Sequence, residues 1–437
     1  MSSRIGYNRE EVICSGGFFL KKRAIAALAL TAALFFAGCA TDTEGTEGGT
    51  YFVQFDMQRQ NVFIDGEQIG ASEFTSLSGK MRGRIAALEE EFSADLAGSD
   101  LSRVNAAAAG ETVSVSGDTM EAFTLAESYA SLTGGSFSPA LFPLTELWKF
   151  SPAYEGRYND PRPSPSADEI AAAKAVSDLS LFDADVGAKT ITKAQSGAKL
   201  DFGGIAKGYM SDAALALLLG QYEGRQVDAI FSVMSNSILL GQKVNKDGTR
   251  RNYTASVTNP RYDPEEPADA GLYIVELSDC ALTTSADNYR FYVYDGRIYP
   301  HIIDGSTGEP ANNGVISITI VMPLSVPHAG AFSDALSTAG FCMPLTDALA
   351  FYEEMNGIYG CTAAVITADF RYYVIGDAQV IGRKQFAQYA NDNLGANNDV
   401  DAIREVFTRA DPEDASDVVI PCEEELAYRE RMAAQSA

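Results

Sequence analysis

The chain has 437 residues, of which 46% are apolar and 10% aromatic, so the composition excludes a disordered chain. A formal net charge of −26 repels a phosphate backbone and argues against nucleic-acid binding. Two histidines and six cysteines without a CxxC spacing argue against a structural zinc site. Spacing alone leaves open whether any of Cys280, Cys342, Cys361 and Cys422 form a disulfide.

The N-terminus has the pattern of a secreted bacterial lipoprotein. Basic residues 21–23 precede a short apolar stretch that ends on Phe36-Ala37-Gly38-Cys39, which looks like a lipobox with Phe where Leu is usual. We expect a signal peptide over 1–38, a lipid on the Cys39 thiol and a polar tether over 39–49. This predicts an extracytoplasmic protein anchored to the cell membrane. An ordinary signal peptide or a membrane anchor is the alternative.

The apolar periodicity predicts helices and strands in mixed order. Helices are expected over 76–93, over 118–135 with Asp118 as N-cap and Gly134-Gly135 as its end, over 167–177 and over 331–343. Residues 151–166 are Pro-rich and predict a loop. Strands are expected over 51–56, 272–277 and 289–299. A strand-turn-strand is expected over 188–204, with 200–202 in its second strand, and a buried strand with its turn over 228–241. A closing hairpin is expected over 362–376, with its turn near Ala368-Asp369.

This order lacks a regular βαβ alternation, so we expect an α+β fold with mixed antiparallel sheets and packed helices. One large domain is expected over 50–376. The chain becomes acidic and amphipathic beyond it, which predicts a helical C-terminal extension over 377–437.

Residues 200–220, LDFGGIAKGYMSDAALALLLG, carry the first stretch with chemical character. The glycine pair Gly203-Gly204 allows close approach of a ligand to the backbone. Lys207 is expected at the start of a helix, where free N–H groups favour anions. Together these features predict a phosphate cradle. A strand–turn–helix corner with a solvated lysine is the alternative.

Two further stretches carry polar residues at suggestive positions. Asp334 and Thr338 are four residues apart, hence on one helical face, and their oxygens suit a hard cation such as Mg²⁺. His301 follows a predicted strand and precedes a turn over 304–308, where it could stack on a ring or bind a phosphate. A helix cap and a surface histidine are the respective alternatives.

Taken in order, these stretches resemble the ApbE-type FAD:protein FMN transferases, over about residues 50–376. Three more blocks resemble that family in the same order: 89–105, 133–150 (TGGSFSPALFPLTELWKF) and 283–292 (TTSADNYRFY). The resemblance implies the family's T-fold-like architecture. It implies Mg²⁺-dependent transfer of FMN from FAD to a threonine of an acceptor flavoprotein, with release of AMP.

The resemblance also implies site residues. Asp201, Lys207 and His301 would contact FAD, and Ser136, Phe137 and Ser138 would line its pocket. The Gly204 carbonyl and the side chains of Asp334 and Thr338 would hold Mg²⁺. Asp334, His301 and Lys207 would carry the chemistry, and either Asp334 or His301 would take the threonine proton.

The sequence departs from the family pattern at four places. Ser138 replaces an Asp, Met234-Ser235-Asn236 replaces a Gly-Gly-Asn/Asp turn, Thr284-Ser285-Ala286 replaces a TSG block, and Gly48-Gly49-Thr50 is a reduced opening. Two alternative functions therefore stay open: a Mg²⁺-dependent FAD pyrophosphatase that yields FMN and AMP, and a flavin-binding lipoprotein without turnover.

Overall fold

The computed structural model describes residues 53–262 and 270–435. The predictions for the signal peptide, for Cys39 and for the tether concern residues outside these ranges. Within the two ranges, none of the helices has both the length and the apolar character that a membrane crossing requires.

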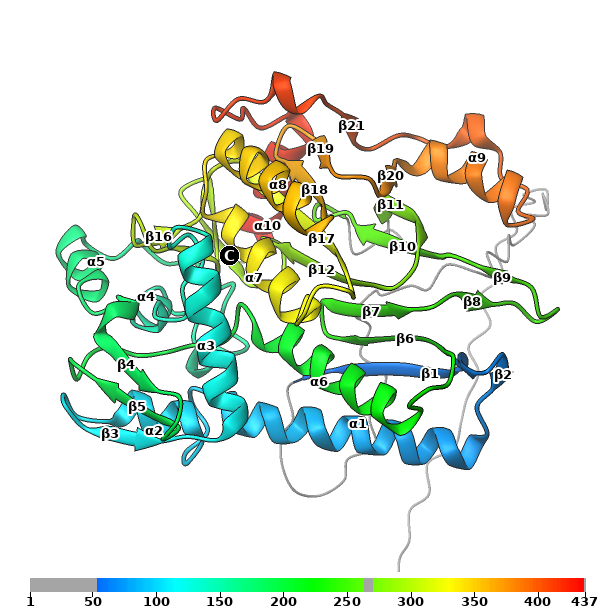
Figure 1. The fold of residues 1–437 in the computed structure, drawn as a ribbon. Helices are drawn as coiled ribbons and strands as arrows, with labels where there is room; N and C mark the ends of the chain where they lie inside the picture. The colour runs from blue at the N-terminus through cyan, green and yellow to red at the C-terminus, as the bar shows by residue number, and fades with distance from the viewer. Residues whose placement is uncertain (1–52, 263–269, 436–437) are drawn as a thin grey trace, which may run out of the picture. The chain divides into compact units, whose positions relative to one another are not determined.

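A nine-stranded sheet forms the centre of the described chain (Figure 1). Its strands pair antiparallel, except that the last one lies parallel to its neighbour. In spatial order they are β2 (Glu67–Gln68), β1 (Phe55–Ile64), β6 (Val227–Val233), β7 (Asn236–Leu240), β12 (Cys280–Ala286), β17 (Val315–Pro323), β18 (Thr362–Thr367), β19 (Arg371–Ile375) and β21 (Thr408–Arg409).

Four helices pack together along one face of this sheet and enclose the main apolar core (Figure 1). They are α1 (Ala71–Phe92), α6 (Ala206–Gln221), α7 (Ala329–Phe341) and α8 (Leu345–Tyr359). In α7 every residue except Thr338 is buried, so other parts of the protein enclose the helix on nearly all sides. A helix enclosed in this way is held in place by its neighbours. Its few buried polar groups are expected to form hydrogen bonds, and any that does not is a candidate functional group.

A smaller sheet covers the opposite face of the central one and encloses a second core. Its strands are β10 (Tyr253–Thr258), β11 (Ala270–Leu277) and β20 (Gln379–Ile381). Helix α9 (Arg383–Asn393) packs against β11, where the rings of Phe386 and Tyr273 stack with centroids 3.7 Å apart.

The remaining strands form small sheets and hairpins, and five more α-helices complete the described chain. Three strands form one small sheet, β3 (Thr112–Ser114), β5 (Thr190–Lys193) and β4 (Phe182–Asp185); three hairpins pair β8 (Lys243–Val244) with β9 (Arg250–Arg251), β13 (Phe291–Tyr294) with β14 (Arg297–Pro300), and β15 (Ile303–Asp304) with β16 (Glu309–Pro310). The other helices are α2 (Asp100–Ala106), α3 (Gly117–Leu132), α4 (Phe142–Leu147), α5 (Ala167–Lys174) and α10 (Glu423–Gln435).

The predicted α+β class is confirmed, but three local predictions need correction. Residues 200–202 form no strand, because the Asn105 side chain bonds both Leu200 N, at 2.7 Å, and Leu200 O, at 2.9 Å, in place of a neighbouring strand. Ser116, not Asp118, caps α3 by accepting a hydrogen bond from Thr119 N. The described part of the C-terminal extension is not wholly helical, since besides α9, α10 and two short 3-10 helices it supplies β20 and β21.

Candidate functional site

The first side of the candidate site is the beginning of α6. The helix starts at Ala206, so Lys207 lies in its first turn, as predicted. The Lys207 Nζ atom donates a 2.8 Å hydrogen bond to Gly203 O, which folds the side chain back over the glycine turn. Gly204 has no room for a side chain, because a Cβ there would lie 2.9 Å from the Phe137 ring and 3.4 Å from Thr338 Oγ1.

The second side is α7, which brings Asp334 and Thr338 to the same place. The Asp334 side chain is 1% exposed, and its Oδ2 atom accepts a hydrogen bond from Gly208 N at 3.2 Å. The other oxygen, Oδ1, is buried without a hydrogen bond and lies 3.1 Å from Lys207 Nζ. Thr338 Oγ1 donates a 3.1 Å hydrogen bond to Asp334 O and would lie 3.4 Å from a Cβ built on Gly204, so the residues predicted to hold the metal are neighbours.

The extended segment before the glycine turn holds Asp201 beside the predicted pocket residues. Asp201 N donates a 2.7 Å hydrogen bond to Pro139 O, which follows directly after Ser136, Phe137 and Ser138. Phe137 is buried against Gly204, whereas Ser136 and Ser138 are partly exposed. The structure therefore brings both stretches together as predicted, with the Phe137 ring in the core and the two serines at the surface.

His301 comes directly after β14 and contacts a residue to which the sequence analysis gave no role. Its backbone N donates to Arg290 O at 2.9 Å, and its Nδ1 atom lies 3.2 Å from the same oxygen. The Arg290 guanidinium lies over the Tyr158 ring, 5.2 Å from its centroid. Arg290 itself is exposed. It belongs to the block 283–292, and the resemblance of that block to a known family could have indicated a functional role.

Charge links these groups into one site. Burial, followed by the positive charges of Arg290 and Lys207, lowers the pKa of His301 to about 3, so the imidazole is neutral at physiological pH. Burial raises the pKa of Asp201, while the Gly203 N–H, Arg290 and Lys207 oppose that rise. The same two cations act on both groups, so Asp201 and His301 lie near Arg290 and Lys207. These two side chains supply the positive charge that an anionic ligand could pair with in an otherwise acidic protein.

A carboxylate on α6, which the sequence analysis missed, joins α6 to α7. The two oxygens of Asp212 accept hydrogen bonds from Gly330 N and Ala331 N, each at 2.8 Å, at the start of α7. This satisfies free N–H groups of the helix and fixes α7 against α6. Since Lys207 lies on one helix and Asp334 on the other, Asp212 helps to set their separation.

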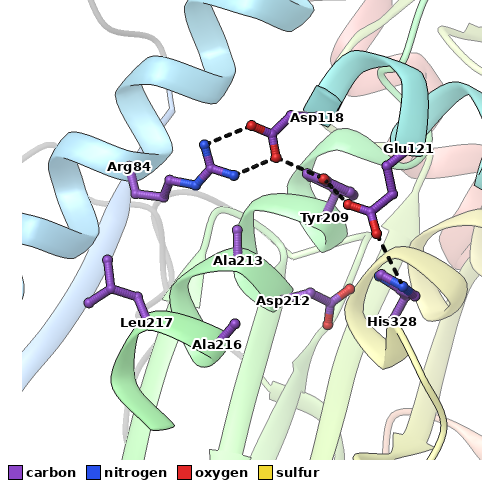
Figure 2. A pocket seen from close by; sticks show the side chains of 9 residues that line it. All are labelled: Arg84, Asp118, Glu121, Tyr209, Asp212, Ala213, Ala216, Leu217 and His328. Carbon is purple, nitrogen blue, oxygen red and sulfur yellow. Dashed lines mark hydrogen bonds and ion pairs between the residues drawn. The ribbon is translucent and has the colours of Figure 1, made fainter. Parts of the chain in front are cut away.

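A cavity of about 420 Å³ lies beside that joint, between α1, α3, α6 and the start of α7 (Figure 2). Its wall contains an ion pair between Arg84 and Asp118, and Tyr209 OH donates to Asp118 and to Glu121. His328 Nε2 lies 3.7 Å from Glu121 Oε1. None of the predicted site residues lines this cavity, so we assign it no part in the site.

The oxygen atoms at the site determine whether it could hold a cation. Within residues 53–262 and 270–435 no group of three His, Cys, Asp or Glu side chains could hold a metal ion. The candidate set is of another kind: one buried carboxylate oxygen without a hydrogen bond, one partly exposed hydroxyl and a backbone carbonyl. Oxygen donors of this kind, completed by water or phosphate oxygens, fit Mg²⁺.

The chain is similar to known proteins over most of its described length. Residues 53–362 match the sequence profile of the ApbE family. The chain belongs to the ApbE family. It is 29% identical over 289 residues to a protein of Treponema pallidum named FAD:protein FMN transferase, a match that covers 62% of this chain and 75% of the relative. A Vibrio cholerae protein of the same name is 27% identical, with 67% and 81% covered.

Solved structures of the family share the fold. The crystal structure of the ApbE protein of Thermotoga maritima is 27% identical and has a TM-score of 0.59, covering 76% of this chain and 96% of that one. The flavin transferase ApbE of Vibrio cholerae has a TM-score of 0.57 at 24% identity and covers 71% of this chain and 91% of that one. This second likeness concerns the fold.

The structure describes the conformation of two residues that depart from the family pattern, Met234 and Ser138. Met234 has a φ of 51°, a left-handed conformation that glycine adopts without strain, and its side chain is 45% exposed. Ser138 Oγ accepts a 3.2 Å hydrogen bond from Ala140 N. Both substitutions lie outside the Lys207–Asp334 pair, which is intact.

Proposed function

We propose that this ApbE-family protein transfers FMN from FAD to a threonine hydroxyl of an acceptor flavoprotein and releases AMP. The observation that carries the proposal is the Lys207–Asp334 pair, in which a lysine at a helix start faces a buried carboxylate oxygen that has no hydrogen bond. The names of the relatives support the reaction class.

The reaction needs positioning and charge neutralisation more than a protein nucleophile. The threonine oxygen of the acceptor attacks the FMN phosphorus, the bond from that phosphorus to the bridging oxygen breaks, and AMP leaves. Lys207 would neutralise charge that develops on the phosphate oxygens. Asp334, Thr338 and the Gly204 carbonyl would hold Mg²⁺, which, when bound, neutralises pyrophosphate charge and orients the attack.

The remaining residues would bind the flavin and receive the proton. Asp201, Arg290, Ser136 and Ser138 would contact FAD, with Phe137 supporting the glycine turn from below. A pKa of about 3 makes His301 a weak proton acceptor at neutral pH, so we assign it to flavin binding. Asp334 is then the candidate acceptor for the threonine proton.

Intact mass measurement tests the proposed function. The full chain in detergent would be mixed with FAD, Mg²⁺ and a protein that carries an acceptor threonine, and AMP would be assayed. We expect the acceptor to gain the mass of one FMN, with one AMP released for each. FMN and AMP without a mass gain would instead identify the pyrophosphatase, and bound but unchanged FAD would identify a flavin-binding protein.

The proposal includes attachment to the cell membrane through a lipid on Cys39, outside the cytoplasm. Its support is the basic and apolar pattern before that residue. Mass spectrometry of the mature N-terminus would reveal the lipid. A Cys39→Ser variant that stays in the membrane fraction would contradict a lipid anchor.

A further inference from the structure

The C-terminal helix α10 docks through a buried network of ionic groups. The Glu425 side chain is fully buried and bonds Arg261, and it accepts a 2.8 Å hydrogen bond from Arg429 Nε. Arg261 is 2% exposed and donates two further bonds, of 2.6 and 2.7 Å, to the two oxygens of Asp287. Arg261 therefore joins α10 to the residue that follows β12.

Apolar contacts support this docking. Tyr428 of α10 packs against Phe291 of β13, with ring centroids 6.4 Å apart, and the Arg261 guanidinium lies 4.7 Å from the Tyr428 centroid. These residues form a small core together with Val293 and Ile298. The helix thus holds the β13–β14 hairpin from outside, by packing as well as by charge.

This docked helix lies outside the family match, which ends at residue 362. Asp287, the residue that α10 holds through Arg261, lies inside the match. Asp287 precedes Arg290 by only three residues, and the Arg290 carbonyl oxygen holds His301 by its backbone N and contacts its ring. The segment between Asp287 and β13 is exposed at Tyr289 and Arg290, so Asp287 and the hairpin are its fixed ends.

We propose that α10 positions Arg290 and His301 for FAD binding, through Glu425, Arg261 and Asp287. Glu425 is then a positioning residue of the site rather than a catalytic one. The inference rests on the proposed function, because it requires that FAD occupies the space that Arg290 and His301 face.

A purely structural role for α10 makes a different prediction. Removing one member of a buried ion network leaves the others unpaired and destabilises the fold. That loss would reduce the amount of folded enzyme, and hence the apparent kcat, but it would leave the KM for FAD unchanged. A positioning role raises the KM for FAD in the folded enzyme.

The test compares Glu425→Gln with Glu424→Gln in the full chain. Glu424 lies on the same helix but is exposed, with a 3.4 Å ion pair to Arg404, so its variant controls for loss of one charge. We expect Glu425→Gln to raise the KM for FAD by about tenfold, with the KM for the acceptor protein within twofold of wild type. Glu424→Gln should match wild type in both.

A second variant keeps the test decisive if Glu425→Gln does not fold. Arg429 is 21% exposed at the edge of the network, and Arg429→Gln should raise the KM for FAD by about threefold. An unchanged KM for FAD in the folded variants of an active enzyme would overturn the positioning role alone. A wild-type chain that binds no FAD would overturn the proposed function and this inference with it.

Discussion

Gly208 of α6 and Gly330 of α7 bring the two helix backbones into direct contact. A Cβ atom built on Gly208 would lie 2.1 Å from Gly330 O, and one built on Gly330 would lie 2.5 Å from Gly208 O. Gly208 follows Lys207 directly, and its N–H bonds Asp334. The close approach of the helices therefore sets the distance between the two charged groups of the site.

Replacing Gly208 with alanine should force the helices apart. We expect the free energy of unfolding to fall by about 3 kcal/mol or more, and activity to fall further than the loss of folded protein explains. Gly220→Ala, at the exposed end of the same helix with no atom near its Cβ, should leave stability equal or raise it by about 0.5–1 kcal/mol. Thermal melts and single-turnover assays would measure both. Wild-type stability in Gly208→Ala would contradict the packing account.

Asp334→Asn should remove Mg²⁺-dependent turnover, because the amide keeps the shape but loses the charge that would hold the cation. We expect kcat/KM to fall at least about 100-fold, while circular dichroism stays that of the wild type. Asp347→Asn, an exposed carboxylate on α8, is the control. Activity within a few fold of wild type in Asp334→Asn would remove this residue from the metal site.

Lys207→Met should slow transfer and tighten Mg²⁺ binding at the same time. Under the proposed function the ammonium stabilises charge on the reacting phosphate, so its loss should cost about 10²–10³ in kcat. The same ammonium pairs with Asp334 Oδ1 and competes there with a cation. Calorimetric titration with Mg²⁺, without FAD, would measure the affinity. Weaker Mg²⁺ binding in the variant would contradict a competition for that oxygen.

Asp212 should make stability depend on pH in an unusual direction. Burial raises its pKa to about 6, against hydrogen bonds from the N–H groups of α7 that lower it. The folded state then binds more protons than the unfolded one between about pH 4 and 6. The contribution of Asp212 to the free energy of unfolding should therefore fall as pH rises through that window, by up to about 3 kcal/mol. Urea unfolding of wild type and Asp212→Asn from pH 4 to 7 isolates the effect. A wild-type protein that gains stability relative to Asp212→Asn as the pH rises would refute it.

His301 should stay neutral far below the usual range for histidine. Its pKa of about 3 predicts no change in the Cε1 proton shift between pH 8 and 4.5 in NMR spectra. His328→Gln simplifies the assignment, because the chain has two histidines. A His301 resonance that titrates near pH 6.5 would show that burial and the charges of Arg290 and Lys207 do not lower its pKa as described.

The positions of several candidate residues were predictable because they lie in short stretches with a characteristic local pattern, and their roles stay predictions. Lys207 at a helix start and Asp334 with Thr338 on one helical face follow from periodicity and spacing alone. Asp212 and Arg290 were missed because their roles depend on contacts with Gly330 and His301, which are remote in sequence. The false strand at 200–202 has the same cause, since the Asn105 side chain supplies the hydrogen bonds that alternation assigns to a neighbouring strand.

Because α7 is buried, the two sides of the site differ in how well they tolerate amino-acid substitutions. Asp334 and Thr338 belong to a helix enclosed on nearly every side, so a substitution near them disturbs the core of the domain. Tyr289 and Arg290 lie on the exposed segment before β13, where substitutions cost little. Under the proposed function, the specificity for an acceptor protein can diverge on this exposed segment while the phosphate chemistry stays constant. The same enclosure makes α7 a poor place to engineer and the exposed segment a good one.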